Sequence, residues 1–187
     1  MRRLFYLSAV LPLLAVLPLL SGGCTAEAKS AETPSPFAAC TALTSSTASN
    51  ALPDLELPCF TGKEKVALRS LRGPAVINLW ASWCEPCRRE LPVMQQLAHT
   101  AGDKLTVLGV DTGDGREAGA SFAADKGVTM PSLFDEDKKL VNAVGGINLP
   151  VTIFLDASGK VFVNKLPLDA AKLTALVKEH TGVAVPL

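Results

Sequence analysis

The sequence predicts an α/β domain with a mixed central sheet and helices on both faces, because two kinds of strand connection follow one another. The apolar runs at residues 76–80 and 105–110 are separated by an amphipathic stretch, and the order strand, helix, strand gives parallel neighbours with right-handed crossovers. Residues 151–155 and 160–163 instead flank Asp-Ala-Ser-Gly, a turn sequence typical of an antiparallel hairpin. A sheet that contains both pairings is mixed.

The amphipathic stretch after the first apolar run predicts the longest helix, at residues 84–98. Leu91, Met94 and Leu97 recur at the spacing of one helix face. Pro92 should kink this helix, because proline cannot donate the backbone hydrogen bond of a helix interior. The other expected elements are strands at 55–60 and 65–68, and helices at 117–125, 138–144 and 169–180.

Composition gives no reason to expect nucleic acid as a partner. Among 187 residues there are 18 lysines plus arginines and 18 aspartates plus glutamates, so the formal net charge is zero. Residues 25–50 are rich in Ala, Ser, Thr and Pro and show no apolar period, which is typical of a flexible tether. We expect one domain after it, at residues 51–187.

The N-terminus is typical of a secretory signal. Arginines precede an almost wholly apolar run at residues 4–20, and small residues follow just before Cys24. This order resembles a bacterial lipoprotein signal, in which the cysteine is lipidated after cleavage, although such signals usually carry a larger aliphatic residue where Ser21 stands. Residues 1–24 are therefore expected to direct export and to leave the chain lipid-anchored outside the cytoplasm, on the cell membrane. Ordinary cleavage and an uncleaved anchor are the alternatives.

The number of cysteines supports lipidation. Five cysteines in an exported chain leave one without a partner, and lipidation of Cys24 would remove it. Cys84 pairs naturally with Cys87, which leaves Cys40 and Cys59 as a structural disulfide, worth roughly 3 kcal/mol in the chain-entropy model. Two unrelated thiols are the alternative, and we favour the bridge because an exposed free cysteine outside the cell tends to oxidise.

The sequence Trp-Cys-Glu-Pro-Cys at residues 83–87 places two thiols at the junction between the first apolar strand and the longest helix. The positive end of a helix favours a thiolate, so a cysteine in the first turn becomes nucleophilic at neutral pH, whereas free cysteine titrates near ~8.5. Pro86 fits the first helical turn, where its missing N–H is not needed. The arrangement predicts a redox dithiol.

A strand, Trp-Cys-x-x-Cys opening a helix, a second strand and a later proline directly before a hairpin strand together resemble the thioredoxin fold, over residues 52–180. The sequence Trp-Ala-Ser-Trp-Cys-Glu-Pro-Cys-Arg-Arg-Glu-Leu-Pro at 80–92 narrows the resemblance to the membrane-tethered TlpA/ResA group. The resemblance implies an extracytoplasmic thiol-disulfide oxidoreductase without a cofactor. Such a protein reduces disulfides of exported proteins, for example apocytochrome c, and depends on a membrane electron-transfer partner. Residues 112–140 leave room for the helical insertion of that group.

The resemblance also implies roles for individual residues. The first cysteine is the more exposed in this fold, so Cys84 would attack a substrate disulfide and Cys87 would resolve the mixed disulfide. Asn78 stands where cytoplasmic thioredoxin has a proton-moving aspartate, and the resemblance implies that Glu90 handles protons or tunes a pKa instead. Spacing alone favours the alternative that Glu90 is a solvated helix residue. Glu85 should raise the thiol pKa and lower the reduction potential, unless it is a surface residue without consequence.

The substrate side of the site is expected around Pro150. In the thioredoxin fold a proline at the start of the hairpin strand is cis and packs opposite the dithiol. Leu149, directly before it, would then present its backbone to a bound substrate segment. Trp83 would form part of the apolar rim of the site, with an ordinary buried tryptophan as the alternative.

Other functions stay open at this point. Thiol-disulfide exchange also runs in reverse, so oxidation or isomerisation in the folding of exported proteins is the first alternative to reduction. A copper-binding chaperone module is the second, since two thiolates hold Cu(I), but His99 and His180 lie on predicted helices away from Pro150. Residues 111–115 lack the alternating acidic ligands and the final glutamate of a calcium loop, and the chain has no Pro-x-x-x-Thr-x-x-Cys element for peroxidase chemistry. We expect no metal site.

Overall fold

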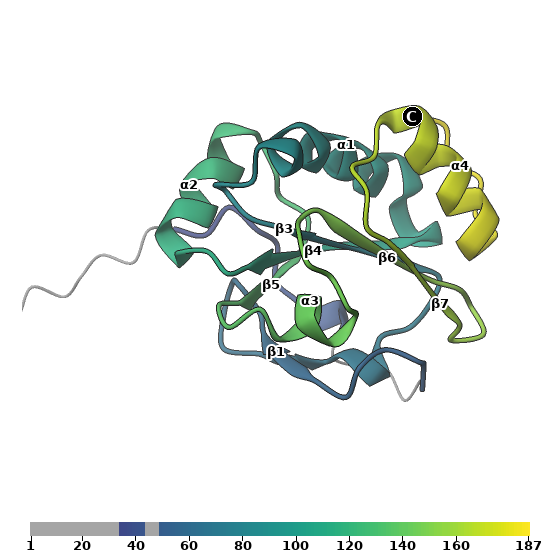
Figure 1. Ribbon diagram of the computed structural model, residues 1–187, viewed down its shortest axis with the longest axis horizontal. Coiled ribbons are helices and arrows are strands. Elements are labelled where there is room, and N and C mark those ends of the chain that lie inside the picture. Colours follow the sequence, from purple (N-terminus) through teal and green to yellow (C-terminus); the bar gives the residue numbers. More distant parts are fainter. Residues whose placement is uncertain (1–33, 44–48) are drawn as a thin grey trace, which may run out of the picture. The chain divides into compact units, whose positions relative to one another are not determined.

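A five-stranded mixed sheet forms the centre of the fold in the computed structural model, which describes residues 34–43 and 49–187 (Figure 1). In spatial order the strands are β5 (Ser132–Asp135), β4 (Thr106–Thr112), β3 (Ala75–Trp80), β6 (Val151–Leu155) and β7 (Val161–Asn164). β3 pairs in parallel with β4 and antiparallel with β6, so the two expected kinds of pairing meet on this strand. The predicted α/β class is confirmed.

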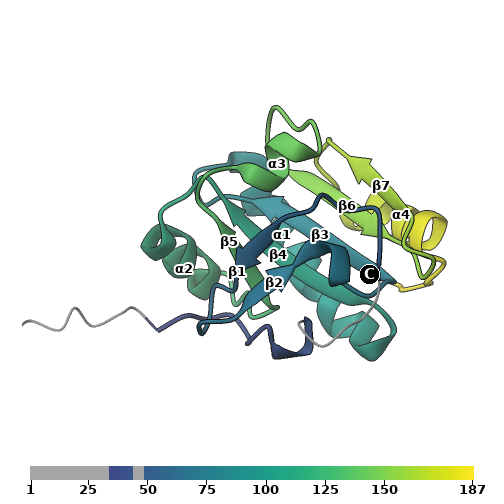
Figure 2. The ribbon, with the colours of Figure 1, turned by 90° about the horizontal axis from the view of Figure 1, so that it is seen from below.

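Helices and a ribbon of two strands cover the two faces of the sheet. One face carries α1 (Glu85–Ala101), α2 (Arg116–Asp125) and α4 (Ala170–Thr181), whose apolar side chains share a core with Val76 and Trp80 of β3. The other face carries α3 (Lys139–Ala143) and the hairpin of β1 (Glu56–Pro58) and β2 (Lys65–Ala67) (Figure 2). Three short 3₁₀ turns complete the described elements: η1 (Thr41–Leu43), η2 (Leu68–Ser70) and η3 (Gly102–Lys104).

The compact unit begins earlier than the expected domain start at residue 51. It spans Thr33–Leu187, and Phe37, Cys40 and Leu43 are buried in it. The second half of the expected tether therefore packs on the domain where the structure describes it. The export segment at 1–24, with Cys24, lies outside the described residues, and none of the described helices is long and apolar enough to cross a bilayer.

Two elements differ from the prediction. The long helix begins at Glu85 rather than at Cys84, because Cys84 has an extended backbone conformation and serves as the N-cap, and the helix continues past Pro92 to Ala101. Strand β5 was not predicted, since residues 112–140 suggested only a helical insertion. It has four residues and gains its strand conformation by pairing in parallel with β4.

Candidate functional site

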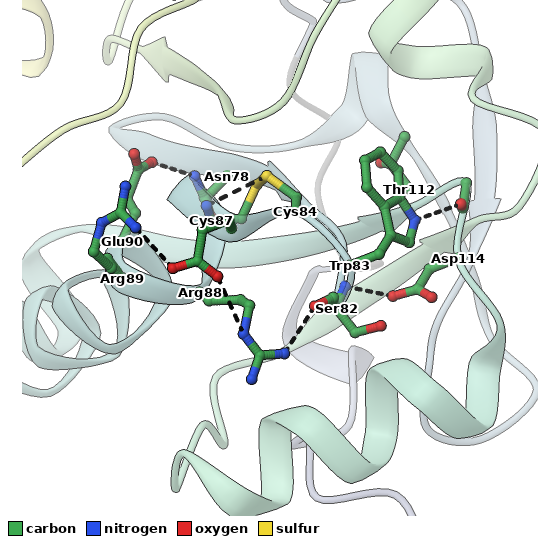
Figure 3. Close-up of a disulfide and its surroundings, with 12 residues drawn as sticks. Asn78, Ser82, Trp83, Cys84, Cys87, Arg88, Arg89, Glu90, Thr112 and Asp114 are labelled. Carbon is green, nitrogen blue, oxygen red and sulfur yellow. Dashed lines mark hydrogen bonds and ion pairs between the residues drawn. A yellow bond between two sulfur atoms is a disulfide. The ribbon is translucent and has the colours of Figure 1, made fainter.

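The Cys84–Cys87 pair lies where β3 ends and α1 begins (Figure 3). The two cysteines form a disulfide, with their Cα atoms 5.3 Å apart. The backbone N–H of Cys87 donates a hydrogen bond to the Sγ of Cys84 at 3.3 Å. Pro86 occupies the first turn of α1, where helix N–H groups have no partner within the helix. After reduction, this N–H and the partial positive charge of the helix end would favour the thiolate of Cys84.

Cys84, and not Cys87, lines a surface cavity of about 330 Å³. Cys87 is 1% exposed and Cys84 is 4% exposed. An incoming sulfur can therefore approach Cys84 through the cavity, while Cys87 is reached only from within the protein. This is the arrangement that a nucleophilic first cysteine and a resolving second cysteine need.

Glu90 is buried on the same helix and accepts hydrogen bonds from three other segments, of which Figure 3 shows the one from Asn78. Its Oε1 accepts hydrogen bonds from Asn78 Nδ2 at 2.7 Å and from Thr152 Oγ1 at 3.1 Å, and its Oε2 accepts one from the Leu168 N–H at 2.7 Å. Glu90 is 2% exposed, so the alternative of a solvated helix glutamate is wrong. Burial raises the pKa of Glu90, although the hydrogen bonds from Leu168, Thr152 and Asn78 act in the lowering direction. Such a carboxyl can take up and release a proton at a higher pH than an ordinary glutamate.

Glu85, between the two cysteines, lies at the surface. Its carboxylate forms ion pairs with Arg89 at 2.8 Å and with Arg88 at 3.9 Å, and its side chain is 73% exposed. Arg88 also donates a hydrogen bond to the carbonyl of Ser82 at 3.0 Å. Solvent and two guanidinium groups thus screen the negative charge of Glu85. Its effect on the thiol pKa stays a prediction.

Two of the predicted substrate-binding residues, Trp83 and Leu149, line the same cavity as Cys84, and Pro150 follows directly after Leu149 without lining it. Trp83 is exposed over more than half of its surface, so the alternative of a buried tryptophan is wrong, and its Nε1 donates to the carbonyl of Gly113 at 3.0 Å. The peptide bond between Leu149 and Pro150 is cis, as the resemblance implies. No hydrogen bond joins Leu149 to another residue in the part of the chain that the structure describes. Its backbone is therefore available to a bound segment.

Sequence reasoning missed five residues that line the cavity: Thr112, Lys138, Val141, Ile147 and Asn148. Ile147 lies close to Leu149 in sequence, so its place could have been predicted from the expected role of Leu149. Lys138 had no local signal, because only the fold brings the start of α3 to the dithiol. The turn after β4 has a structural role, since Asp114 Oδ2 accepts a hydrogen bond at 2.5 Å from the backbone N–H of Ser82.

The remaining predicted residues lie away from the cavity. Cys40 and Cys59 form a second disulfide, with Cα atoms 5.9 Å apart, and both are buried. His99 is in the last turn of α1, and the His180 ring on α4 stacks on Phe162 with centroids 3.6 Å apart. None of these four residues lines the cavity at Cys84.

The part of the chain that carries this site matches a known protein family. The model of the AhpC/TSA family matches residues 48–163, which is more than half of the chain and includes the dithiol, Glu90 and Pro150. The chain belongs to the AhpC/TSA family. As an AhpC/TSA family member with the strand order above, it has the thioredoxin-like fold that the sequence predicts.

Individual relatives of this AhpC/TSA chain are thiol-disulfide proteins by name. The thiol-disulfide oxidoreductase ResA of Bacillus subtilis is 32% identical over 103 residues, which cover 54% of this chain and 58% of ResA. The chain spans less than two thirds of the length of the curated relatives that it matches. The structure of MTB dsbF aligns with a TM-score of 0.64 and 28% identity over 70% of this chain and 100% of that one. A secreted thiol-disulfide isomerase from Corynebacterium glutamicum aligns with a TM-score of 0.59 and 25% identity over 67% of this chain and 82% of that one.

Proposed function

We propose that this chain is an extracytoplasmic thiol-disulfide oxidoreductase that reduces disulfides of exported proteins. The observation that carries the proposal is the position of Cys84 at the N-terminus of α1 and on a surface cavity, with Cys87 shielded behind it. The name of ResA supports the activity, and that of the secreted isomerase supports both the activity and the compartment. The secretory signal expected at residues 1–24 supports the same compartment.

The proposed reaction consists of two exchange steps. The Cys84 thiolate attacks one sulfur of the substrate disulfide, forms a mixed disulfide and expels the first substrate thiolate. Cys87 then loses its proton, attacks the Sγ of Cys84 and expels the second substrate thiolate. Two electrons pass from the dithiol to the substrate, and the Cys84–Cys87 disulfide is left. Glu90 is proposed to accept the Cys87 proton, because it lies on the next turn of the same helix face.

The finer assignments rest on the resemblance to the TlpA/ResA group. They are apocytochrome c as a substrate, a membrane protein dithiol as the reductant that regenerates the Cys84/Cys87 pair, and a lipid anchor at Cys24. A fraction of full-length protein that stays in the membrane after salt washing, and becomes soluble when Cys24 is replaced by serine, would support the anchor. Equal release of both forms would contradict it.

Replacement of the two cysteines tests the mechanism. Cys84→Ser should abolish reduction of an insulin-type disulfide substrate and remove the reactivity of the protein with a thiol probe at mildly acid pH. Cys87→Ser should instead accumulate a mixed disulfide, because the resolving thiol is missing. The two variants control for each other, since each leaves one thiol at the site. Retained exchange activity in Cys84→Ser would show that Cys84 is not the nucleophile.

The reduction potential of the Cys84/Cys87 couple tests the direction. A value near the ~ −270 mV of thioredoxin favours a reductant, and a value near ~ −120 mV favours an oxidant of exported dithiols. Equilibration with glutathione buffers of known potential gives this value directly.

A further inference from the structure

Two charged side chains line the cavity at Cys84: Glu85, which pairs with Arg88 and Arg89, and Lys138, which forms no ion pair with any residue that the structure describes. We propose that Lys138, together with Trp83 and Ile147, forms a subsite for an acidic residue next to the reactive disulfide of the substrate. The preferred partner is thus an extended segment of an exported protein with a carboxylate close to its cysteine. This inference rests on the proposed function and specifies the substrate class.

The position of Lys138 is fixed by the fold. Its backbone is left-handed, with φ 60° and ψ 28°, and its N–H donates to the carbonyl of Asp135 at 3.1 Å. Its aliphatic chain lies against the backbone of Gly113, where a Cβ would collide with the Cγ and Cε of the lysine. Its Nζ lies 5.7 Å from the centroid of the Trp83 ring. The ammonium group therefore lies beside Trp83 at the rim of the cavity.

The neighbouring acidic groups have other partners. The carboxylate of Asp137 pairs with Lys139 at 2.7 Å, and that of Glu85 pairs with Arg89 at 2.8 Å. The two oxygens of Asp135 accept hydrogen bonds from backbone N–H groups at the start of α3. Lys138 forms no ion pair or side-chain hydrogen bond with any residue that the structure describes. A carboxylate of the substrate segment would give the Lys138 ammonium an ion-pair partner.

The rest of the cavity fits an extended peptide. Trp83 and Ile147 are 58% and 94% exposed and line the same cavity, so together they present apolar surface that a bound segment can cover. The unpaired backbone of Leu149 can hydrogen-bond a segment in the manner of an added strand. Alternate side chains of such a segment would face the apolar rim and Lys138, within reach of a cysteine placed at Cys84.

Peptide substrates that differ by one residue test the subsite. Reduced protein is mixed with disulfide peptides that carry Asp, Asn or Lys, scanned over the two positions on each side of the cysteine, and the exchange rate is measured. At the best position the Asp peptide should react about two- to fivefold faster than the Asn peptide, the range of an exposed ion pair, and the Lys peptide more slowly. The preference should fall as salt is added. Because all rates use the same Cys84 thiolate, their ratio is independent of the pKa of Cys84.

Variants assign the preference to Lys138. Lys138→Met should bring the ratio of the Asp-peptide rate to the Asn-peptide rate close to one. Lys138→Glu should reverse the preference, so that the Lys peptide reacts fastest. Lys139→Glu is the matched control, because it makes the same change of charge at a residue that does not line the cavity and should retain most of the preference. The exchange rate with the Asn peptide shows whether each variant is folded and active.

Two outcomes overturn the proposal: a wild-type ratio of one at every position, or an unchanged ratio in Lys138→Met. Absence of exchange with all three peptides would overturn the proposed function itself, which separates the two failures.

Discussion

Glu85 and Glu90 lie on the same helix, yet their surroundings give them different chemistry. Glu85 is 73% exposed at its side chain and is paired with arginines. Glu90 is 2% exposed and accepts three hydrogen bonds from other segments. Because Asn78 cannot accept a proton from a thiol at neutral pH, its role here is to donate a hydrogen bond to Glu90. At this scale, the buried carboxyl is the group suited to proton exchange with the dithiol.

Replacement of Glu90 by glutamine should slow disulfide reduction by at least about tenfold, because the site then lacks its proton acceptor. The same change removes a negative charge, so the pH at which the dithiol reacts with iodoacetamide should fall. The measurements are the exchange rate and the pH profile of alkylation.

The control for this prediction is Glu117→Gln, on the exposed surface of α2, which should leave both quantities unchanged. A Glu90→Gln variant with a slower rate but an unaltered alkylation profile would show that Glu90 only supports the packing of the site.

Much of the site could be predicted residue by residue. The chemistry of Cys84 and Cys87 follows from two thiols at a helix start, and the cis Leu149–Pro150 bond from the resemblance. The burial of Glu90 was left open, although Cys87 and Met94 flank it at helical spacing on a buried stripe. Lys138 was beyond prediction, since its contact with the dithiol region depends on tertiary packing alone.

At the scale of secondary-structure elements, the contact of β4 with α2 contains an unusual buried acid. Asp111 is fully buried, and neither of its carboxylate oxygens has a hydrogen-bond partner among the described residues. The oxygen Oδ2 lies against Gly119 of α2, where a Cβ would collide with it. Burial, followed by the nearby charge of Asp114, raises the pKa of Asp111 to about 8. The glycine allows the helix to pack closely over a protonated carboxyl.

This packing predicts a pH-dependent stability. An unfolded aspartate loses its proton near ~3.9, whereas folded Asp111 keeps it to about 8. Between these values only the unfolded state is ionised, so the free energy of unfolding should fall as pH rises, by at most about 1.4 kcal/mol per pH unit. Asp111→Asn has no carboxyl to ionise, so this pH-dependent contribution to the free energy of unfolding is absent in the variant. The stability of the variant relative to the wild type should therefore increase from pH 5 to pH 8 in denaturant titrations.

The matched control for the pH series is Asp125→Asn, at an exposed position of α2. Its difference from the wild type in the free energy of unfolding should stay constant over that range. Parallel curves for Asp111→Asn and the wild type would mean that Asp111 is already ionised in the fold.

Elements were predictable where their signal is local. The buried run of β3 and the turn between β6 and β7 can be identified from short stretches of sequence. β5 could not, because Ser-Leu-Phe-Asp is short and is followed by a run of charged residues, and its strand conformation comes from pairing with β4. The start of α1 was misplaced by one residue because Cys84 caps the helix without entering it.

At the scale of the whole molecule, the two disulfides differ in what they connect. Cys84–Cys87 closes a loop with a sequence separation of 3, at the start of one helix. Cys40–Cys59 closes a loop with a separation of 19. It joins the segment at residues 34–43 to the part of the chain just after β1. The segment also contributes Phe37, whose ring packs edge to face on Phe60 with centroids 4.7 Å apart. The second disulfide therefore holds part of the core in place.

The last prediction concerns this bridge. In a background of Cys84→Ser and Cys87→Ser, Cys40–Cys59 is the one disulfide left in the described part of the chain. Reduction with a phosphine should then lower the free energy of unfolding by roughly 3 kcal/mol, because the unfolded chain regains the freedom of an open loop. Both sulfur atoms remain in place, so oxidised and reduced forms differ by the cross-link and not by lost side chains. Equal unfolding midpoints for the two forms in urea would contradict a stabilising role, and the packing of residues 34–43 would then suffice by itself.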